Sequence, residues 1–209
     1  MEQKDLFTKV YREDIWRIIP GAPKSGPGSS LEWTKNIIRE LPVLFKDFDI
    51  YTVLDIPCGD FTWFSQVDRS NIDYVGADIV SDIVQDNIKA YPGIAFVEMD
   101  LLTSKLPAFD LILCRDCLFH FQEKNIRKAL TNIKNSGSKY LLTTTHTWRS
   151  FPNAMDTDMW STDSVFYHKL NLMLPPYNLP PPILVIPEGN NEPNASDRVL
   201  ALWECSSLP

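Results

Sequence analysis

From residue 51 onward, short apolar runs rich in β-branched residues alternate with amphipathic helical patterns, and this alternation constrains the fold more than any other feature. Strands joined by helices pair in parallel and are covered by helices on both faces, so the chain is predicted to be a doubly wound α/β protein. A Pro- and Asn-rich turn joins the last two runs and predicts a terminal hairpin with an antiparallel strand. The predicted strands are 51–56, 72–77, 94–97, 109–114, 140–145, 183–186 and 199–205, and the helices are 61–69, 81–90 and 122–135.

The first 50 residues differ from this pattern. They hold two amphipathic helical patterns, Leu6 to Ile19 and Leu31 to Phe45, separated by a Pro- and Gly-rich stretch over 20–28 that cannot be helical. Ser29 or Ser30 is a suitable N-cap for the second helix. We therefore divide the chain into an N-terminal helical cover, 1–50, and an α/β domain, 51–209. Within that domain, the aromatic, Asp- and Pro-rich segment 146–182 is interpreted as an inserted substrate cover.

Charge and composition exclude several classes of protein. Twenty basic against 27 acidic residues give a net charge of −7, which disfavours a DNA or RNA partner. No run of 18 apolar residues and no signal-peptide pattern is present, so we expect a cytoplasmic protein without a membrane partner. The four cysteines lie in apolar stretches and are expected to be reduced. The Cys114-Arg-Asp-Cys117 pair has a metal-ligand spacing but no convincing fourth ligand, so no metal site is predicted.

Three acidic residues end three consecutive predicted strands: Asp55, Asp78 and Asp100. In an open α/β sheet these ends meet at one crevice, which is where such folds bind ligands. Asp55 and the turn Pro57 to Gly59, followed by a predicted helix N-terminus, suit a ligand that carries an amine and a carboxylate. Asp78 suits the two hydroxyls of a ribose, and Asp100 suits an adenine amino group. Each acid alone can also be read as a helix cap or a turn residue.

The segments Val53-Leu-Asp-Ile-Pro-Cys-Gly59, Tyr74-Val-Gly-Ala-Asp78, Val97-Glu-Met-Asp-Leu101 and Phe109-Asp-Leu-Ile-Leu-Cys114 resemble the class I S-adenosylmethionine-dependent methyltransferases. The resemblance implies a Rossmann-like, seven-stranded, mostly parallel sheet with an antiparallel last strand, and S-adenosylmethionine as the cofactor. Pro57 and Phe61 stand where the family usually has glycines. The cofactor contacts expected from the resemblance are Asp55, Pro57, Cys58, Gly59, Asp78, Ile79, Asp100, Leu101 and Arg115.

The family's reaction is an in-line displacement of the methyl group, in which positioning does most of the work and a hydroxyl acceptor also needs a base. The candidates follow the fourth and fifth predicted strands: Asp116, His120 and His146. His146 is the preferred base because it emerges directly from strand 140–145. Both histidines can equally be structural, and Asp116 can cap the next helix.

The expected acceptor contacts lie in the flanking helices and in the segment after the fifth strand: Trp33, Trp148, Arg149, Asp156 and Trp160. Aromatic rings of this kind stack on sugars or aromatic acceptors. The first hypothesis is therefore an enzyme that methylates a hydroxyl or amine of a small molecule, such as a saccharide or a secondary metabolite. The second is a non-catalytic module that binds S-adenosylmethionine as a sensor or partner subunit.

Overall fold

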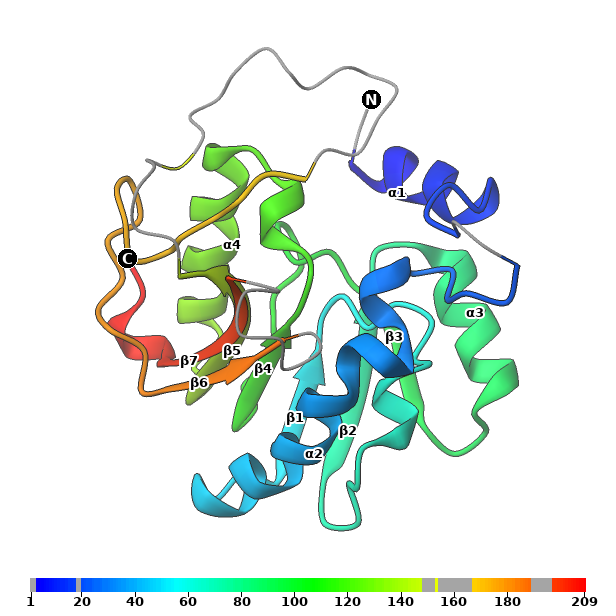
Figure 1. The fold of residues 1–209 in the computed structure, drawn as a ribbon, viewed down its shortest axis with the longest axis horizontal. Coiled ribbons are helices and arrows are strands. Elements are labelled where there is room, and N and C mark those ends of the chain that lie inside the picture. Colours follow the sequence, from blue (N-terminus) through cyan, green and yellow to red (C-terminus); the bar gives the residue numbers. More distant parts are fainter. Residues whose placement is uncertain (1–2, 18–19, 148–152, 154–166, 189–196) are drawn as a thin grey trace.

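The computed structural model describes residues 3–17, 20–147, 153, 167–188 and 197–209, and these form a seven-stranded sheet flanked by helices (Figure 1). The strand order is β3-β2-β1-β4-β5-β7-β6. All seven predicted strands are present. Their bounds are β1 Thr52–Asp55, β2 Asp73–Asp78, β3 Ala95–Glu98, β4 Leu111–Cys114, β5 Tyr140–His146, β6 Leu184–Pro187 and β7 Arg198–Glu204.

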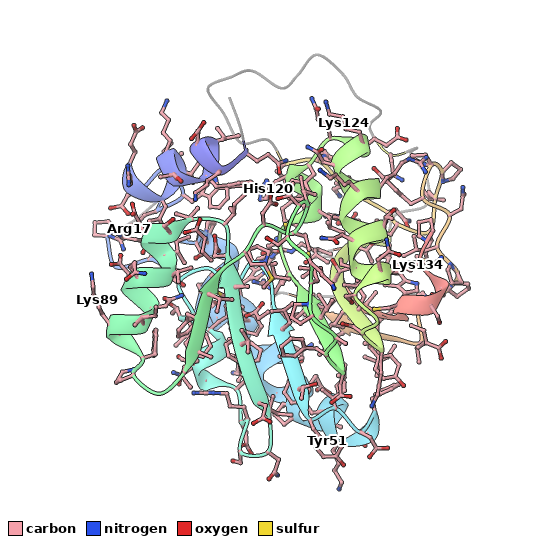
Figure 2. The ribbon with its side chains drawn as sticks, turned by 180° about the vertical axis from the view of Figure 1, so that it is seen from behind. Arg17, Tyr51, Lys89, His120, Lys124 and Lys134 are labelled. Carbon is pink, nitrogen blue, oxygen red and sulfur yellow. The ribbon has the colours of Figure 1, made fainter. Side chains whose placement is uncertain are left out.

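Among the described strands, β7 is the one that runs against the others. It pairs antiparallel with β5 on one side and with β6 on the other, whereas β1 pairs in parallel with both β2 and β4. This confirms the predicted sheet with an antiparallel last strand. The carboxyl ends of the parallel strands share one edge, which Figure 2 shows as the edge near His120, opposite the edge near Tyr51.

Four α-helices accompany the sheet in the described part of the chain: α1 Gln3–Arg12, α2 Leu31–Asp47, α3 Ser81–Ala90 and α4 Glu123–Asn135. Ser30 is the N-cap of α2, and its hydroxyl accepts a hydrogen bond from the Trp33 backbone N–H at 3.3 Å, as the sequence predicted. The helix α3 has the predicted bounds, and α1 ends earlier than its apolar pattern suggested. No helix in the described ranges combines the length and the apolar character needed to span a bilayer.

Successive side chains along the strands point to opposite faces of the sheet and form one apolar core on each face. Val53 of β1 and Leu111 of β4 pack with α2 on one face, while Leu54 and Ile112 pack with α4 on the other. All four are fully buried. The two helices therefore cover opposite faces of the sheet, and Figure 1 shows α2 in front of β1 and β2.

The predicted helix 61–69 is wrong. The chain after β1 makes only one 3-10 turn, Phe64–Gln66, because Phe61 has a φ of 58°, in the left-handed region that a right-handed helix cannot use. The ring of Phe61 is fully buried and packs against Tyr74 and Phe96. Burial of this ring therefore outweighs the helical pattern, and β1 is not followed by a helix N-terminus.

Replacing Phe61 by alanine should lower the free energy of unfolding by about 3–5 kcal/mol, because the ring is lost while the strained φ remains. Urea unfolding of the natural chain and of Phe61→Ala measures the change. Ile88→Ala, at a half-exposed position on α3, is the control and should cost much less. A loss below about 1 kcal/mol for Phe61→Ala would contradict the proposed balance between burial and strain.

Candidate functional site

A pocket lies along the carboxyl ends of β3, β2, β1 and β4, which are neighbours in the sheet. Its lining surrounds about 970 Å³ of non-atom space, which includes open solvent. All nine residues predicted as cofactor contacts line it: Asp55, Pro57, Cys58, Gly59, Asp78, Ile79, Asp100, Leu101 and Arg115.

Asp55 ends β1 and is 1% exposed. The Tyr74 hydroxyl donates a hydrogen bond to its Oδ2 at 2.8 Å. Burial raises the pKa of Asp55 to about 8, although Tyr74 and the charge of Arg115 hold the pKa down. A buried carboxylate of this kind is stabilised by a cationic ligand, since an opposite charge restores its ionised form.

Asp78 ends β2 and is also buried. It accepts hydrogen bonds from the backbone N–H groups of Gly59, at 3.2 Å, and Val80, at 2.9 Å. Burial raises the pKa of Asp78 to about 6, and these backbone donors oppose the rise. Two N–H donors leave further acceptor positions on the two carboxylate oxygens, so Asp78 both fixes the first turn and faces the pocket.

Asp100 follows β3 and shapes its own turn. Its oxygens accept from the Leu102 N–H at 2.8 Å and the Thr103 hydroxyl at 2.6 Å. Asp100 is therefore a turn residue, and it also lines the pocket beside Met99 and Leu101.

The first turn is built against the N-terminal segment instead of on a helix. Gly59 has a φ of 56°, and a Cβ there would lie 2.4 Å from the Ser25 hydroxyl oxygen. The same hydroxyl oxygen accepts from the Asp60 N–H at 2.7 Å, and Asp60 accepts from the Ser25 N–H at 3.1 Å. The Asn87 side chain donates to the Gly59 carbonyl at 2.7 Å. Glycine is required here because the two segments approach so closely.

At the end of β4, Arg115 and Asp116 enter the pocket lining together. The Arg115 guanidinium donates to both carboxylate oxygens of Glu188, at 3.1 and 3.2 Å, and to the Gly28 carbonyl at 2.7 Å. Burial opposes its charge, but Asp116 and Glu188 outweigh burial and raise the pKa of Arg115. Asp116 has a φ of 51° and accepts from the Thr144 hydroxyl at 3.2 Å. Non-glycine residues in this region cluster at functional sites.

The N-terminal segment forms much of the remaining pocket wall. Trp16 stacks on His120, with ring centroids 5.2 Å apart and planes at 22°, and Phe7 meets both rings edge-on. These N-terminal residues could not be assigned to the pocket from sequence, because no pattern indicates where a separate helix will dock. Those that line it are Gln3, Phe7, Val10, Tyr11, Trp16, Lys24, Ser25 and Ser29.

Residues 53–136 match the family model described as a methyltransferase domain. The segment from β1 to α4 is therefore similar to a methyltransferase domain. A search of curated proteins finds no match.

Solved structures share the fold of this chain at low identity. The PH0226 protein from Pyrococcus horikoshii has a TM-score of 0.61 and 16% identity, over 91% of this chain and 98% of that one. The 1,6-didemethyltoxoflavin-N1-methyltransferase from Burkholderia thailandensis has a TM-score of 0.61 and 13% identity, over 98% and 91%. The magnesium protoporphyrin IX methyltransferase from Synechocystis has a TM-score of 0.53 and 12% identity, over 70% of this chain and 72% of that one.

The chemistry of the pocket residues fits S-adenosylmethionine, the cofactor of this family. The buried carboxylate of Asp55 and the buried guanidinium of Arg115 lie at the ends of the adjacent strands β1 and β4. Their charges are opposite to those of an amino acid's ammonium and carboxylate, respectively. Asp78 and Asp100 follow in order along the sheet, as a ribose and an adenine require. No helix N-terminus follows β1, and Arg115 is a cation in the pocket lining whose charge suits the carboxylate.

The predicted base His146 does not line the pocket. Its ring is 1% exposed, its Nε2 lies 2.6 Å from the Tyr167 hydroxyl, and its Nδ1 lies 3.1 Å from the Leu170 carbonyl oxygen. Burial lowers the pKa of His146. The side chain therefore turns into the chain that follows β5, while His120 and Asp116 line the pocket.

The predicted acceptor contacts are only partly described. Trp33 lies at the start of α2 under the Arg198 guanidinium, 5.0 Å from its ring centroid, and is not among the pocket residues. Within the proposed cover, 146–182, the described stretch 167–182 packs Leu170 and Leu172 into the core on the α4 face. Four predicted contacts fall outside the described residues: Trp148, Arg149, Asp156 and Trp160.

The four cysteines are buried free thiols. Within the described ranges, no group of three or more His, Cys, Asp or Glu side chains is arranged to hold a metal ion. Cys114 ends β4, and Cys117 lines the pocket.

The raised pKa of Asp55 predicts a pH-dependent stability. Between pH 5 and 8 the folded chain keeps a proton that the unfolded chain releases, so the free energy of unfolding falls as pH rises. Asparagine does not titrate, so Asp55→Asn lacks this fall. Between pH 5 and pH 8 its free energy of unfolding should therefore rise relative to that of the natural chain by at least about 1.4 kcal/mol, the value of one pKa unit. Urea unfolding without cofactor at both pH values measures it, and a difference that does not change with pH would contradict it.

Proposed function

We propose that the methyltransferase domain binds S-adenosylmethionine along this pocket and transfers its methyl group to a hydroxyl or amine of a small-molecule acceptor. The observation that carries the proposal is the order of charges on neighbouring strands, with Asp100, Asp78, Asp55 and Arg115 following β3, β2, β1 and β4. This order matches the order of adenine, ribose, ammonium and carboxylate in the cofactor.

Each end of the cofactor has a group of matching chemistry. Asp55 pairs with the ammonium and Arg115 with the carboxylate, while the free acceptor positions of Asp78 take the ribose hydroxyls. Ile79 and Leu101 supply apolar surface beside the adenine. When bound, the cofactor supplies an activated methyl group on a positively charged sulfur.

Two residues are proposed for the acceptor side. Asp116 is held by Thr144 and Arg115, and its carboxylate accepts a hydrogen bond from the acceptor's hydroxyl or amine. His120 lies on the pocket wall four residues further on and is the base for a hydroxyl acceptor. Trp16 and Phe7 pack on His120, so the wall around it is apolar.

Charge and fold relatives favour a small acceptor. The net charge of −7 opposes a polyanionic substrate. One structural relative is a toxoflavin-precursor N1-methyltransferase and another acts on magnesium protoporphyrin IX, so the fold in both serves a small molecule. The expected acceptor contacts Trp148, Arg149, Asp156 and Trp160 remain part of this proposal.

Titration calorimetry with S-adenosylhomocysteine tests the cofactor site. The natural chain should bind it, and Asp78→Asn should weaken binding about 10-fold or more, since a hydrogen bond to a charged group contributes about 1.5–3 kcal/mol. Asp73→Asn is the matched control, because Asp73 is the exposed first residue of the same strand. Absence of binding, or equal affinity in Asp78→Asn, would reject the cofactor site.

A panel of hydroxylated and amine-bearing small molecules, assayed by release of S-adenosylhomocysteine, tests the acceptor side. With an accepted substrate, Asp116→Asn and His120→Gln should each lower kcat about 10²-fold or more, and His120→Gln should leave the affinity for S-adenosylhomocysteine within about twofold. His168→Gln is the control histidine and should retain activity. Full activity in both site variants would refute these assignments.

A further inference from the structure

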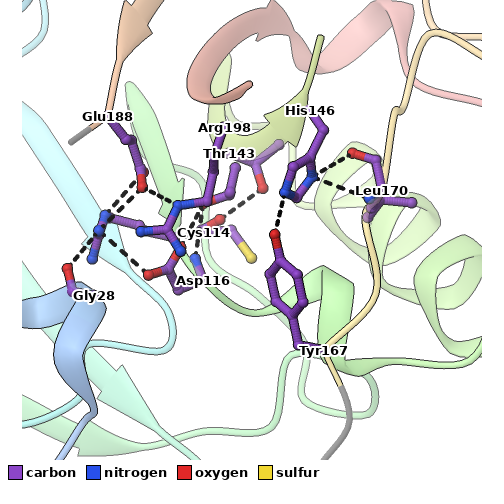
Figure 3. A network of polar contacts seen from close by, with 11 residues as sticks. Gly28, Cys114, Asp116, Thr143, His146, Tyr167, Leu170, Glu188 and Arg198 are labelled. Atoms are coloured by element: carbon purple, nitrogen blue, oxygen red, sulfur yellow. Dashed lines mark hydrogen bonds and ion pairs between the residues drawn. The ribbon is translucent and has the colours of Figure 1, made fainter. Parts of the chain in front are cut away.

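Four charged side chains form a cluster that links the carboxyl end of β4 to the end of β6 and the start of β7 (Figure 3). Glu188, directly after β6, accepts from Arg115 and lies 2.7 Å from the Arg198 Nε. Arg115 lies 3.3 Å from an Asp116 oxygen, and Arg198 lies 3.6 Å from the other. We call these four residues the Glu188 cluster.

The centre of this cluster is almost fully buried. The side chain of Glu188 has no exposed surface, and that of Arg115 is 3% exposed. Desolvation of buried ions costs so much that such a pair often stabilises a fold less than an apolar pair of the same size. Stability alone therefore does not account for the cluster, and its position beside the pocket suggests a role in the site.

The contacts of Glu188 fix the plane of the Arg115 guanidinium. Two parallel N–H···O bonds from Nε and Nη2 hold the fork in one orientation, and Nη2 also donates to the Gly28 carbonyl at 2.7 Å. The guanidinium carbon lies 5.3 Å from the centre of the Trp63 ring, which also lines the pocket. Arg115 consequently has little freedom to adjust when a ligand arrives.

We propose that Glu188 is a positioning residue for the cofactor's amino-acid end, holding Arg115 where the ligand carboxylate binds. This inference rests on the proposed function. Glu188 lies 73 residues after Arg115 and outside the segment 53–136 that matches the methyltransferase family model. The last two strands thus complete the cofactor site, because β6 delivers Glu188 to the end of β4.

Calorimetry with two ligands tests the inference. S-adenosylhomocysteine carries the amino-acid end, whereas 5′-methylthioadenosine has the same nucleoside and lacks both the ammonium and the carboxylate. Glu188→Gln keeps the shape of the side chain but loses the charge that orients Arg115. It should weaken S-adenosylhomocysteine at least 10-fold and leave 5′-methylthioadenosine within twofold.

Two further variants support the test. Glu188→Asp keeps the charge, which protects the fold, but its side chain is one methylene shorter and cannot hold both Arg115 nitrogens as before. It should weaken the binding of S-adenosylhomocysteine at least threefold and leave the affinity for 5′-methylthioadenosine unchanged. Asp197→Asn is the matched control. It breaks the more exposed ion pair with Lys169 next to Arg198 and should leave both affinities unchanged.

The outcomes separate the two proposals. If the natural chain binds neither ligand, the proposed function itself fails. If the natural chain binds both but Glu188→Gln and Glu188→Asp weaken them equally, or weaken neither, the function stands and the positioning role of Glu188 is overturned. Selective loss of S-adenosylhomocysteine in the Glu188 variants supports the role.

Discussion

The parallel pairing of β1 with β2 and β4 is the constraint on which the rest of the structure depends. It brings Asp55, Asp78 and Arg115 to one edge of the sheet, although they are spread over 61 positions of the chain. Buried charges at such an edge are costly unless partners satisfy them. Tyr74, backbone N–H groups and Glu188 supply these partners, and the three residues line one pocket.

The parts of the molecule that could be predicted from sequence are those set by local pattern. Alternating apolar runs predicted all seven strands, and the period of α3 gave its bounds, because burial on a sheet or helix face is written directly into residue order. The acids that end the strands could be assigned to one pocket for the same reason, since the topology of a parallel sheet dictates where strand ends meet.

The features that could not be predicted depend on contacts between distant segments. Phe61 follows a helical pattern, but its ring is buried among aromatic residues at a left-handed φ, and tertiary packing overrides the local preference. His146 ends its strand, yet its ring pairs with Tyr167 and is not part of the pocket lining. Trp16 joins the pocket only because α1 docks there, and Glu188 only because of the terminal strand pair.

The close passage of the N-terminal loop over the charged cluster limits how this sequence can drift. A Cβ on Gly28 would lie 2.6 Å from an Asp116 oxygen and 3.3 Å from an Arg198 nitrogen. Asp116 cannot easily give way, because two guanidinium groups and Thr144 hold it. Descendants of this chain that keep the cluster are therefore confined to glycine at position 28, whereas Gly21, with open space around it, is free of that steric restriction.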